Sequence, residues 1–78
     1  MNLSLCALQP NEEAVVLELP KEERIANRLR EMGLLPGTTI VFVRRAPLGD
    51  PLEIRLRGYS LSLRQNEAAS ILVKKREA

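Results

Sequence analysis

The sequence predicts a mainly β fold: a small, closed or nearly closed barrel of about five to six short strands, one capping α-helix and a short helical turn before the last strand. Residues 47–64 hold two runs of strict apolar–polar alternation around a glycine-containing reversal, which is typical of a half-buried hairpin. Further short apolar runs with strand character precede and follow it. A chain of 78 residues has room for one hydrophobic core, so we expect one domain over residues 1–78.

The hairpin is the clearest predicted element. Leu52, Ile54 and Leu56 alternate with charged residues, and after a reversal at residues 58–59 the alternation resumes over residues 60–64. A lone hairpin is marginally stable in water. Its leucine face must therefore pack against the rest of the chain.

The first half of the chain predicts an entry segment, a strand and a helix. Residues 3–8 should pack as a short strand or turn, and residues 14–19 should form a strand that ends at Pro20. Residues 21–32 carry apolar side chains at helical spacing. No Ser, Thr, Asp or Asn immediately precedes them, so the helix start is poorly capped. Gly33 is the expected helix stop, because glycine readily takes the left-handed conformation.

The second half predicts two more strands joined through the hairpin. Residues 39–44 are apolar on both faces, so this strand should be central or covered by the helix on one side. Residues 46–51 form a loop with two prolines, which restrict φ. Asn66 is a good cap for a single helical turn. A last strand is expected over residues 70–75, running into a disordered tail at 75–78.

The chemical inventory of the chain is small. It has no histidine and a single cysteine, Cys6, which removes the commonest general base and any thiolate zinc site. The acidic pairs at 12–13 and 22–23 are adjacent in sequence, so their side chains do not converge. We therefore expect no enzyme activity, no catalytic residues, no metal site and no cofactor. The lone cysteine, with neither a signal peptide nor a membrane-spanning run, indicates the cytoplasm.

Charge is unevenly distributed along the chain. Residues 1–39 carry six acids and four bases, whereas residues 40–78 carry four acids and eight bases. The polar sides of the late strands are therefore positive. This pattern indicates either a solvated face or a docking surface for an acidic partner.

Three segments together carry a resemblance to a known family. They are Arg28-Leu29-x-x-Met32-Gly33-Leu34-x-Pro36-Gly37-x-x-Ile40, Ala46-Pro47-Leu48-Gly49-Asp50-Pro51, and Gly58-x-x-Leu61-x-Leu63-Arg64-x-x-Glu67-Ala68-x-x-Ile71-x-Val73. In this order and spacing they resemble the ferrous iron transport protein A family (FeoA). One departure lies in the turn at residues 9–12, where the family usually has a glycine.

The resemblance implies an SH3-like barrel and a role as a small cytoplasmic accessory protein of bacterial ferrous iron uptake. The implied partner is the ferrous iron permease, ferrous iron transport protein B, contacted through its cytoplasmic GTP-binding domain. Membrane association would then occur only through the permease, and no direct contact with nucleic acid is expected. Turns and core packing explain the motif residues, so the motif identifies the family without locating a binding site.

Docking candidates are the residues that packing leaves unexplained. Leucines outside the alternating faces are either buried plugs or exposed contacts. The aspartate has turn hydrogen bonding as its alternative role, and the outward arginines have a solvated strand face as theirs. The candidate set is Leu34, Leu48, Asp50, Arg44, Arg55, Arg57 and Arg64.

Two other functions compete with docking on the permease. The basic late strands would suit a nucleic-acid-binding barrel, although few aromatic residues are present to stack on bases. A related barrel serves as an intramolecular docking domain in iron-dependent repressors, but this chain has no DNA-binding helices. Exposed apolar residues such as Leu48 would also permit a homo-oligomer.

Overall fold

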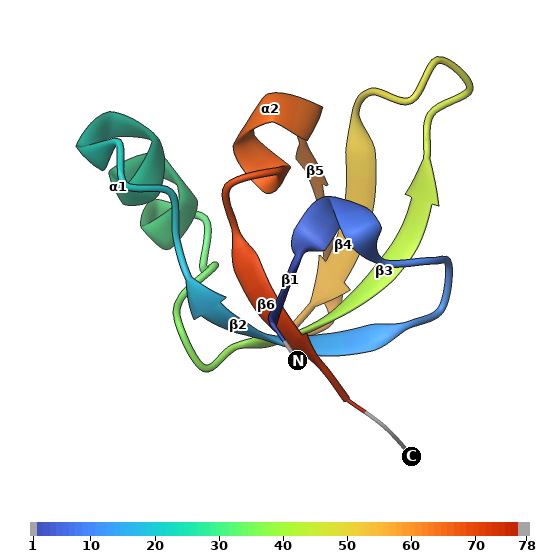
Figure 1. Ribbon diagram of the computed structural model, residues 1–78, viewed down its shortest axis with the longest axis horizontal. Helices are drawn as coiled ribbons and strands as arrows, with labels where there is room; N and C mark the ends of the chain where they lie inside the picture. The colour runs from blue at the N-terminus through green and yellow to red at the C-terminus, as the bar shows by residue number, and fades with distance from the viewer. Residues whose placement is uncertain (1, 77–78) are drawn as a thin grey trace.

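Six short strands form one antiparallel sheet in a computed structural model of the chain, which describes residues 2–76 (Figure 1). The strands are β1 (Asn2–Ser4), β2 (Glu13–Glu18), β3 (Thr39–Arg45), β4 (Leu52–Leu56), β5 (Tyr59–Leu63) and β6 (Leu72–Lys75). Their order across the sheet is β1-β6-β2-β3-β4-β5. The expected mainly β fold is confirmed.

Two register shifts bend this sheet. The pairing of β2 with β6 shifts between Val16 and Glu18, and the pairing of β3 with β4 shifts between Phe42 and Arg44. An extra residue in one strand increases the local twist and redirects the chain. The sheet curls as a result, but its edge strands β1 and β5 do not pair with each other within the described residues.

The core fills the inside of the curled sheet. The inward positions of β4 are all buried, as the alternation predicts, and Leu63 of β5 is buried with them. Burying a leucine or isoleucine side chain contributes about 1.5–3 kcal/mol, so this set dominates stability. The buried cluster also includes Phe42, Ile40, Val16, Ala14, Leu5, Leu8, Leu29, Leu34, Ala68, Ile71 and Val73.

The hairpin reverses one residue earlier than the sequence predicts. Leu56 pairs with Tyr59, so the turn consists of Arg57 and Gly58, with φ values of 50° and 86°. Positive φ at both central residues defines a type I′ turn, whose twist matches that of the flanking strands. Tyr59 therefore begins β5 instead of belonging to the turn.

Helix α1 (Glu23–Glu31) lies beside the curled sheet (Figure 1). Its N-cap residue, Glu22, makes no side-chain capping bond, as expected from the sequence. Gly33 follows the helix at φ 94°, and the Leu34 N–H donates to the Leu29 carbonyl at 3.0 Å. This is the helix stop that the sequence predicts. Because the stop directs the chain inward, Leu34 enters the core.

Strand β3 is central, as its two apolar faces predict, since it pairs with β2 and β4. Ile40 and Phe42 point into the core, while Val41 and Val43 lie half-buried on the other face. Figure 1 shows α1 away from β3, so it is the sheet position, not a helix cover, that accounts for the pattern.

The turn that departs from the family pattern keeps the geometry a glycine would provide. Asn11 has a φ of 71°, and asparagine tolerates this left-handed region better than most residues. Its N–H donates to the Phe42 carbonyl at 2.7 Å. Before it, the entry segment forms β1 and a 3₁₀ turn, η1 (Leu5–Ala7), as a short strand and turn were expected.

The last elements differ from prediction in their boundaries. The helical turn α2 (Gln65–Ala68) is present, but its N-cap position is Arg64, so Asn66 lies inside the turn and does not cap it. Lys75 ends β6, and the Arg76 N–H donates to the Glu13 carbonyl at 2.8 Å. The predicted tail at 75–78 is therefore ordered at its first two residues, while residues 77–78 lie outside the described chain.

Candidate docking surface

The loop between β3 and β4 presents Leu48 to solvent. The Leu48 side chain is 96% exposed, the largest exposure of any large apolar residue among residues 2–76. Internal hydrogen bonds shape the loop: the Ala46 N–H donates to the Pro51 carbonyl at 3.0 Å, and the Gly49 N–H donates to the Ala46 carbonyl at 2.7 Å. Leu48 is thus not a buried plug, and its role as a contact stays a prediction.

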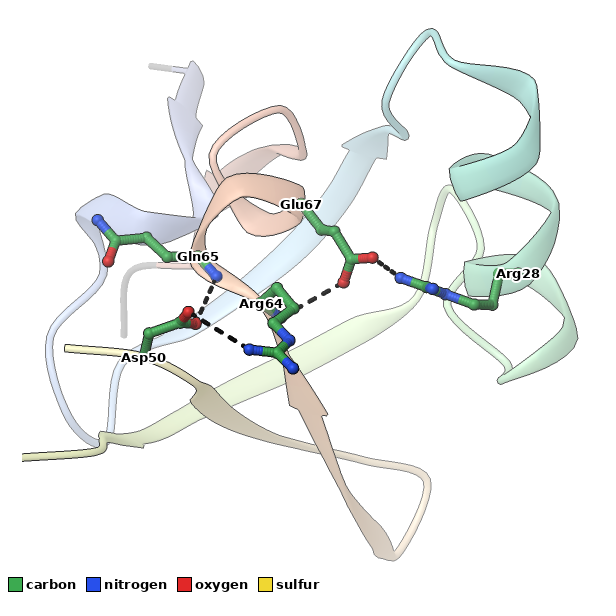
Figure 2. A network of polar contacts seen from close by, with 5 residues as sticks. All are labelled: Arg28, Asp50, Arg64, Gln65 and Glu67. Atoms are coloured by element: carbon green, nitrogen blue, oxygen red, sulfur yellow. Dashed lines mark hydrogen bonds and ion pairs between the residues drawn. The ribbon is translucent and has the colours of Figure 1, made fainter. Parts of the chain in front are cut away.

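Asp50 attaches this loop to α2. One carboxylate oxygen of Asp50, Oδ1, accepts a hydrogen bond from the Gln65 N–H at 2.8 Å, as Figure 2 shows. The first N–H groups of a helix have no partner within the helix, so an acceptor there acts as a cap. The cap of α2 therefore comes from a distant loop, and Asp50 orders the loop and the turn together.

A chain of polar contacts continues from Asp50 to α1 (Figure 2). The other Asp50 oxygen lies 3.9 Å from a guanidinium nitrogen of Arg64. Glu67 accepts from the Arg64 N–H at 3.3 Å and forms an ion pair with Arg28 of α1. Arginine has no acceptor atom, so the capping interaction here is one-sided, from Glu67 to the Arg64 backbone. The network joins the loop, α2 and α1.

An open hollow lies over this network. It measures about 630 Å³ and is lined by Asp50, Arg64, Gln65, Asn66, Glu67 and Ala69. Five of its six lining residues carry polar or charged side chains, so it offers several groups for polar contact with a partner.

The outward arginines do not form one patch. Arg44 is engaged by Glu53, with Nε to carboxylate oxygen at 3.0 Å. Arg64 lies at the loop end of β5, whereas Arg57 lies in the hairpin turn at the opposite end. Glu53 and Arg57 are four residue steps apart along the strand, roughly 13 Å. Of the four candidate arginines, Arg44 and Arg64 thus share the loop end with Leu48 and Asp50.

Leu34 does not belong to the surface, because it is fully buried. It takes the plug role that the sequence left open for it.

Conversely, sequence reasoning did not propose Gln65, Glu67 or Arg28 as site residues. A glutamate three residues after the residue that precedes a helix is a recognisable capping signal, so the role of Glu67 could have been predicted from the sequence. The roles of Arg28 and Gln65 could not have been predicted, because their partners are distant in the chain.

Titratable chemistry on this surface is limited. Within residues 2–76, no three His, Cys, Asp or Glu side chains come together to hold a metal ion. Elsewhere, a hydrogen bond from Lys75 and a second from the Gln9 N–H hold the pKa of Glu12 below its ordinary value. No helix among the described residues combines the length and apolarity needed to cross a membrane.

The fold and surface define a class: a small SH3-like β domain whose exposed features are an anchored loop and scattered basic side chains. The family model described as the FeoA domain matches residues 3–75. The chain belongs to the FeoA domain family.

Individual relatives agree with this assignment. A Porphyromonas gingivalis protein named Fe(2+) transport protein A/Fe(2+) transporter FeoB fusion protein is 37% identical over 71 residues, which are 91% of this chain. The chain spans only 8% of that relative's length. The NMR structure of an FeoA-like protein from Clostridium acetobutylicum has a TM-score of 0.88 at 36% identity, covering 99% of this chain and 90% of that one.

A more distant solved structure also shares the fold. The T. acidophilum IdeR crystal structure has a TM-score of 0.84 at 21% identity, covering 96% of this chain and 34% of that one. At this identity the similarity concerns the fold alone.

Proposed function

We propose that this chain is an accessory protein of ferrous iron uptake that docks on the cytoplasmic GTP-binding domain of a membrane permease. The observation that carries the proposal is the P. gingivalis relative, whose name joins Fe(2+) transport protein A with the FeoB transporter in a single polypeptide. Joining two partners in one chain raises their effective concentration. Such a fusion favours a physical association between the separate proteins as well.

The anchored loop is the proposed contact. Leu48 projects from a loop whose ends are hydrogen-bonded to each other. The Asp50 carboxylate also joins this loop to α2. Pre-ordering lowers the conformational entropy lost on binding. A leucine that moves from solvent into a partner's pocket contributes about 1.5–3 kcal/mol. Leu48 is therefore the main anchor, with Arg44 and Arg64 as charged neighbours at the same end.

The test is a titration of the purified chain with the permease's soluble cytoplasmic domain. Leu48→Ala should weaken binding by roughly 10- to 100-fold while leaving stability nearly unchanged. Leu35→Ala is the matched control, because Leu35 is a second exposed leucine, 37% exposed, on a different loop. Equal affinity of the two variants for the domain would show that Leu48 is not the contact. If the chain bound neither the domain nor the full-length permease, the proposed function would be refuted.

No specific observation favours the nucleic-acid or repressor alternatives. Among residues 2–76 the outward arginines are dispersed, with Arg44 on β3, Arg55 on β4, and the other two in the hairpin turn and just after β5, whereas phosphate binding favours a continuous basic stripe. The likeness to IdeR is one of fold. We therefore retain docking on the permease as the proposed function.

A further inference from the structure

Strand β5 leaves one edge of the sheet unpaired. Its only strand neighbour within the described residues is β4. Because Leu56 and Tyr59 flank a two-residue turn, they form a hydrogen-bonded pair in which each backbone N–H donates to the other residue's carbonyl. The same pairing recurs at every second residue of β5, so Leu61 and Leu63 also bond to β4. The N–H and C=O groups of Ser60 therefore point away from β4, as do those of the next serine, Ser62.

The chain segment after α1 contacts this edge at Tyr59, but beyond Tyr59 the edge carries no charged residue, proline or bulge that would prevent strand pairing. Proteins blunt an edge with charge, proline, a bulge or very short length. Residues 59–63 read Tyr-Ser-Leu-Ser-Leu, and the register with β4 contains no shift. The opposite edge strand, β1, has three residues against five in β5. The β5 edge is the more complete template for an added strand.

Side chains beside β5 offer both apolar and charged contacts. α1 reaches the start of the strand, where the Tyr59 hydroxyl donates to the Met32 carbonyl. Towards the other end a groove of about 490 Å³ runs between the strand and the helix. Alternate side chains of an added strand would face such a groove. Its lining includes Arg28, Met32, Ser62, Leu63, Arg64 and Glu67.

The charges around the edge select an acidic partner. Arg57 precedes β5 and Arg55 projects from the neighbouring strand, whereas Arg64, which follows β5, lies 3.9 Å from the Asp50 carboxylate. Neither Arg55 nor Arg57 forms an ion pair within residues 2–76, whereas the nearby carboxylate of Glu53 is engaged by Arg44. Complementary charge favours association and sets the register. An acidic strand would provide that charge.

We propose that the free edge of β5 binds an extended, acidic segment of another protein by strand addition, through the outward backbone groups of Ser60 and Ser62. A second copy of this chain fits less well. Two β5 edges paired antiparallel about Leu61 would bring Arg57 of one copy near Arg64 of the other, and like charges across strands repel. The backbone edge at Ser60 and Ser62 does not include Leu48, although Arg64 borders both surfaces, and the proposal does not depend on docking to the permease.

The test uses two synthetic peptides of about ten residues, one alternating valine with glutamate and the other valine with lysine. Isotope-labelled chain is titrated with each, and amide shifts and hydrogen exchange are followed by NMR. The acidic peptide should shift the Ser60 and Ser62 amides and slow their exchange. The basic peptide should leave them unchanged.

Proline and alanine variants separate the backbone from the side chain. Ser62→Pro removes the outward N–H without touching the ladder to β4, so the fold should persist. It should weaken binding of the acidic peptide by at least about tenfold. Ser62→Ala keeps the N–H and should bind normally. Ser60→Pro provides a second test if the first variant unfolds.

Three outcomes would overturn the proposal. They are an acidic peptide that leaves both serine amides unshifted, equal binding of the basic peptide, and concentration-dependent self-association that Ser62→Pro abolishes. A chain that binds the acidic peptide at β5 but not the permease would keep this proposal while refuting the proposed function.

Discussion

Substituting Gly33 with alanine perturbs the backbone and a tertiary contact together. Gly33 has a φ of 94°, a region that costs an L-residue with a Cβ about 1–2 kcal/mol. The new Cβ would also overlap the Tyr59 hydroxyl. Because Tyr59 is 42% exposed, its ring can swing away. That movement sacrifices its bond to the Met32 carbonyl, worth about 1 kcal/mol.

Together these effects predict a destabilisation of about 2–3 kcal/mol for Gly33→Ala. For a domain of this size the melting temperature should fall by about 10–20 °C. Thermal and urea unfolding followed by circular dichroism measure both quantities. In a Tyr59→Phe background the same substitution should cost about 1 kcal/mol less, because the hydroxyl is already absent.

Gly37→Ala is the matched control for this experiment. Gly37 has a φ of 93°, and nothing lies within 4 Å of the added Cβ. It should show only the backbone cost of about 1–2 kcal/mol, and Tyr59→Phe should not alter that cost. A Gly33→Ala loss below about 0.5 kcal/mol, the range of an ordinary surface substitution, would refute the reasoning. The reasoning would also be refuted if Gly33→Ala lowered the free energy of unfolding equally in the original chain and in the Tyr59→Phe background.

The remaining predictions concern two carboxylates. The hydrogen bond from Lys75 lowers the pKa of Glu12 in the folded protein. The contribution of Glu12 to the free energy of unfolding is therefore complete above the ordinary glutamate pKa of 4.5 and disappears as the pH falls through the lowered pKa. Urea unfolding across this range should show Glu12→Gln less stable than the original chain at neutral pH, with the gap closing in acid; a gap independent of pH would contradict this. Asp50→Ala should lower stability by about 1 kcal/mol, as loss of a helix cap does, and should weaken permease binding through the freed loop. Asp50→Asn keeps an acceptor oxygen and should retain most of both properties in the same unfolding and titration assays.

Local patterns in the sequence were sufficient for most of the fold. The alternation at Leu52, Ile54 and Leu56 predicted the inward face of β4, and Gly33 predicted the end of α1. Errors arose where neighbouring residues compete for a role. The turn moved to Arg57-Gly58, because a two-residue I′ geometry matches strand twist and an arginine accepted positive φ. Asn66 lost the capping role to Asp50, which is remote in sequence.

The candidate site was less predictable than the fold. Sequence analysis placed Leu34 and Leu48 in the same category, since neither belongs to an alternating face. The structure separates them completely, one fully buried and the other 96% exposed. It also divides the arginines between two ends of the hairpin. Burial of a residue outside a periodic element depends on where distant segments pass, so local pattern does not determine it.

By itself the sequence determined the family, the strand character and the core residues that lie on periodic faces, because backbone preference and hydrophobic periodicity act over a few neighbouring positions. Only the tertiary structure decided that Asp50 holds a loop to α2, that Leu48 projects into solvent and that β5 keeps a free edge. Each of these depends on contacts between segments far apart along the chain. Such contacts exist only after the sheet has curled and its strands have taken their order.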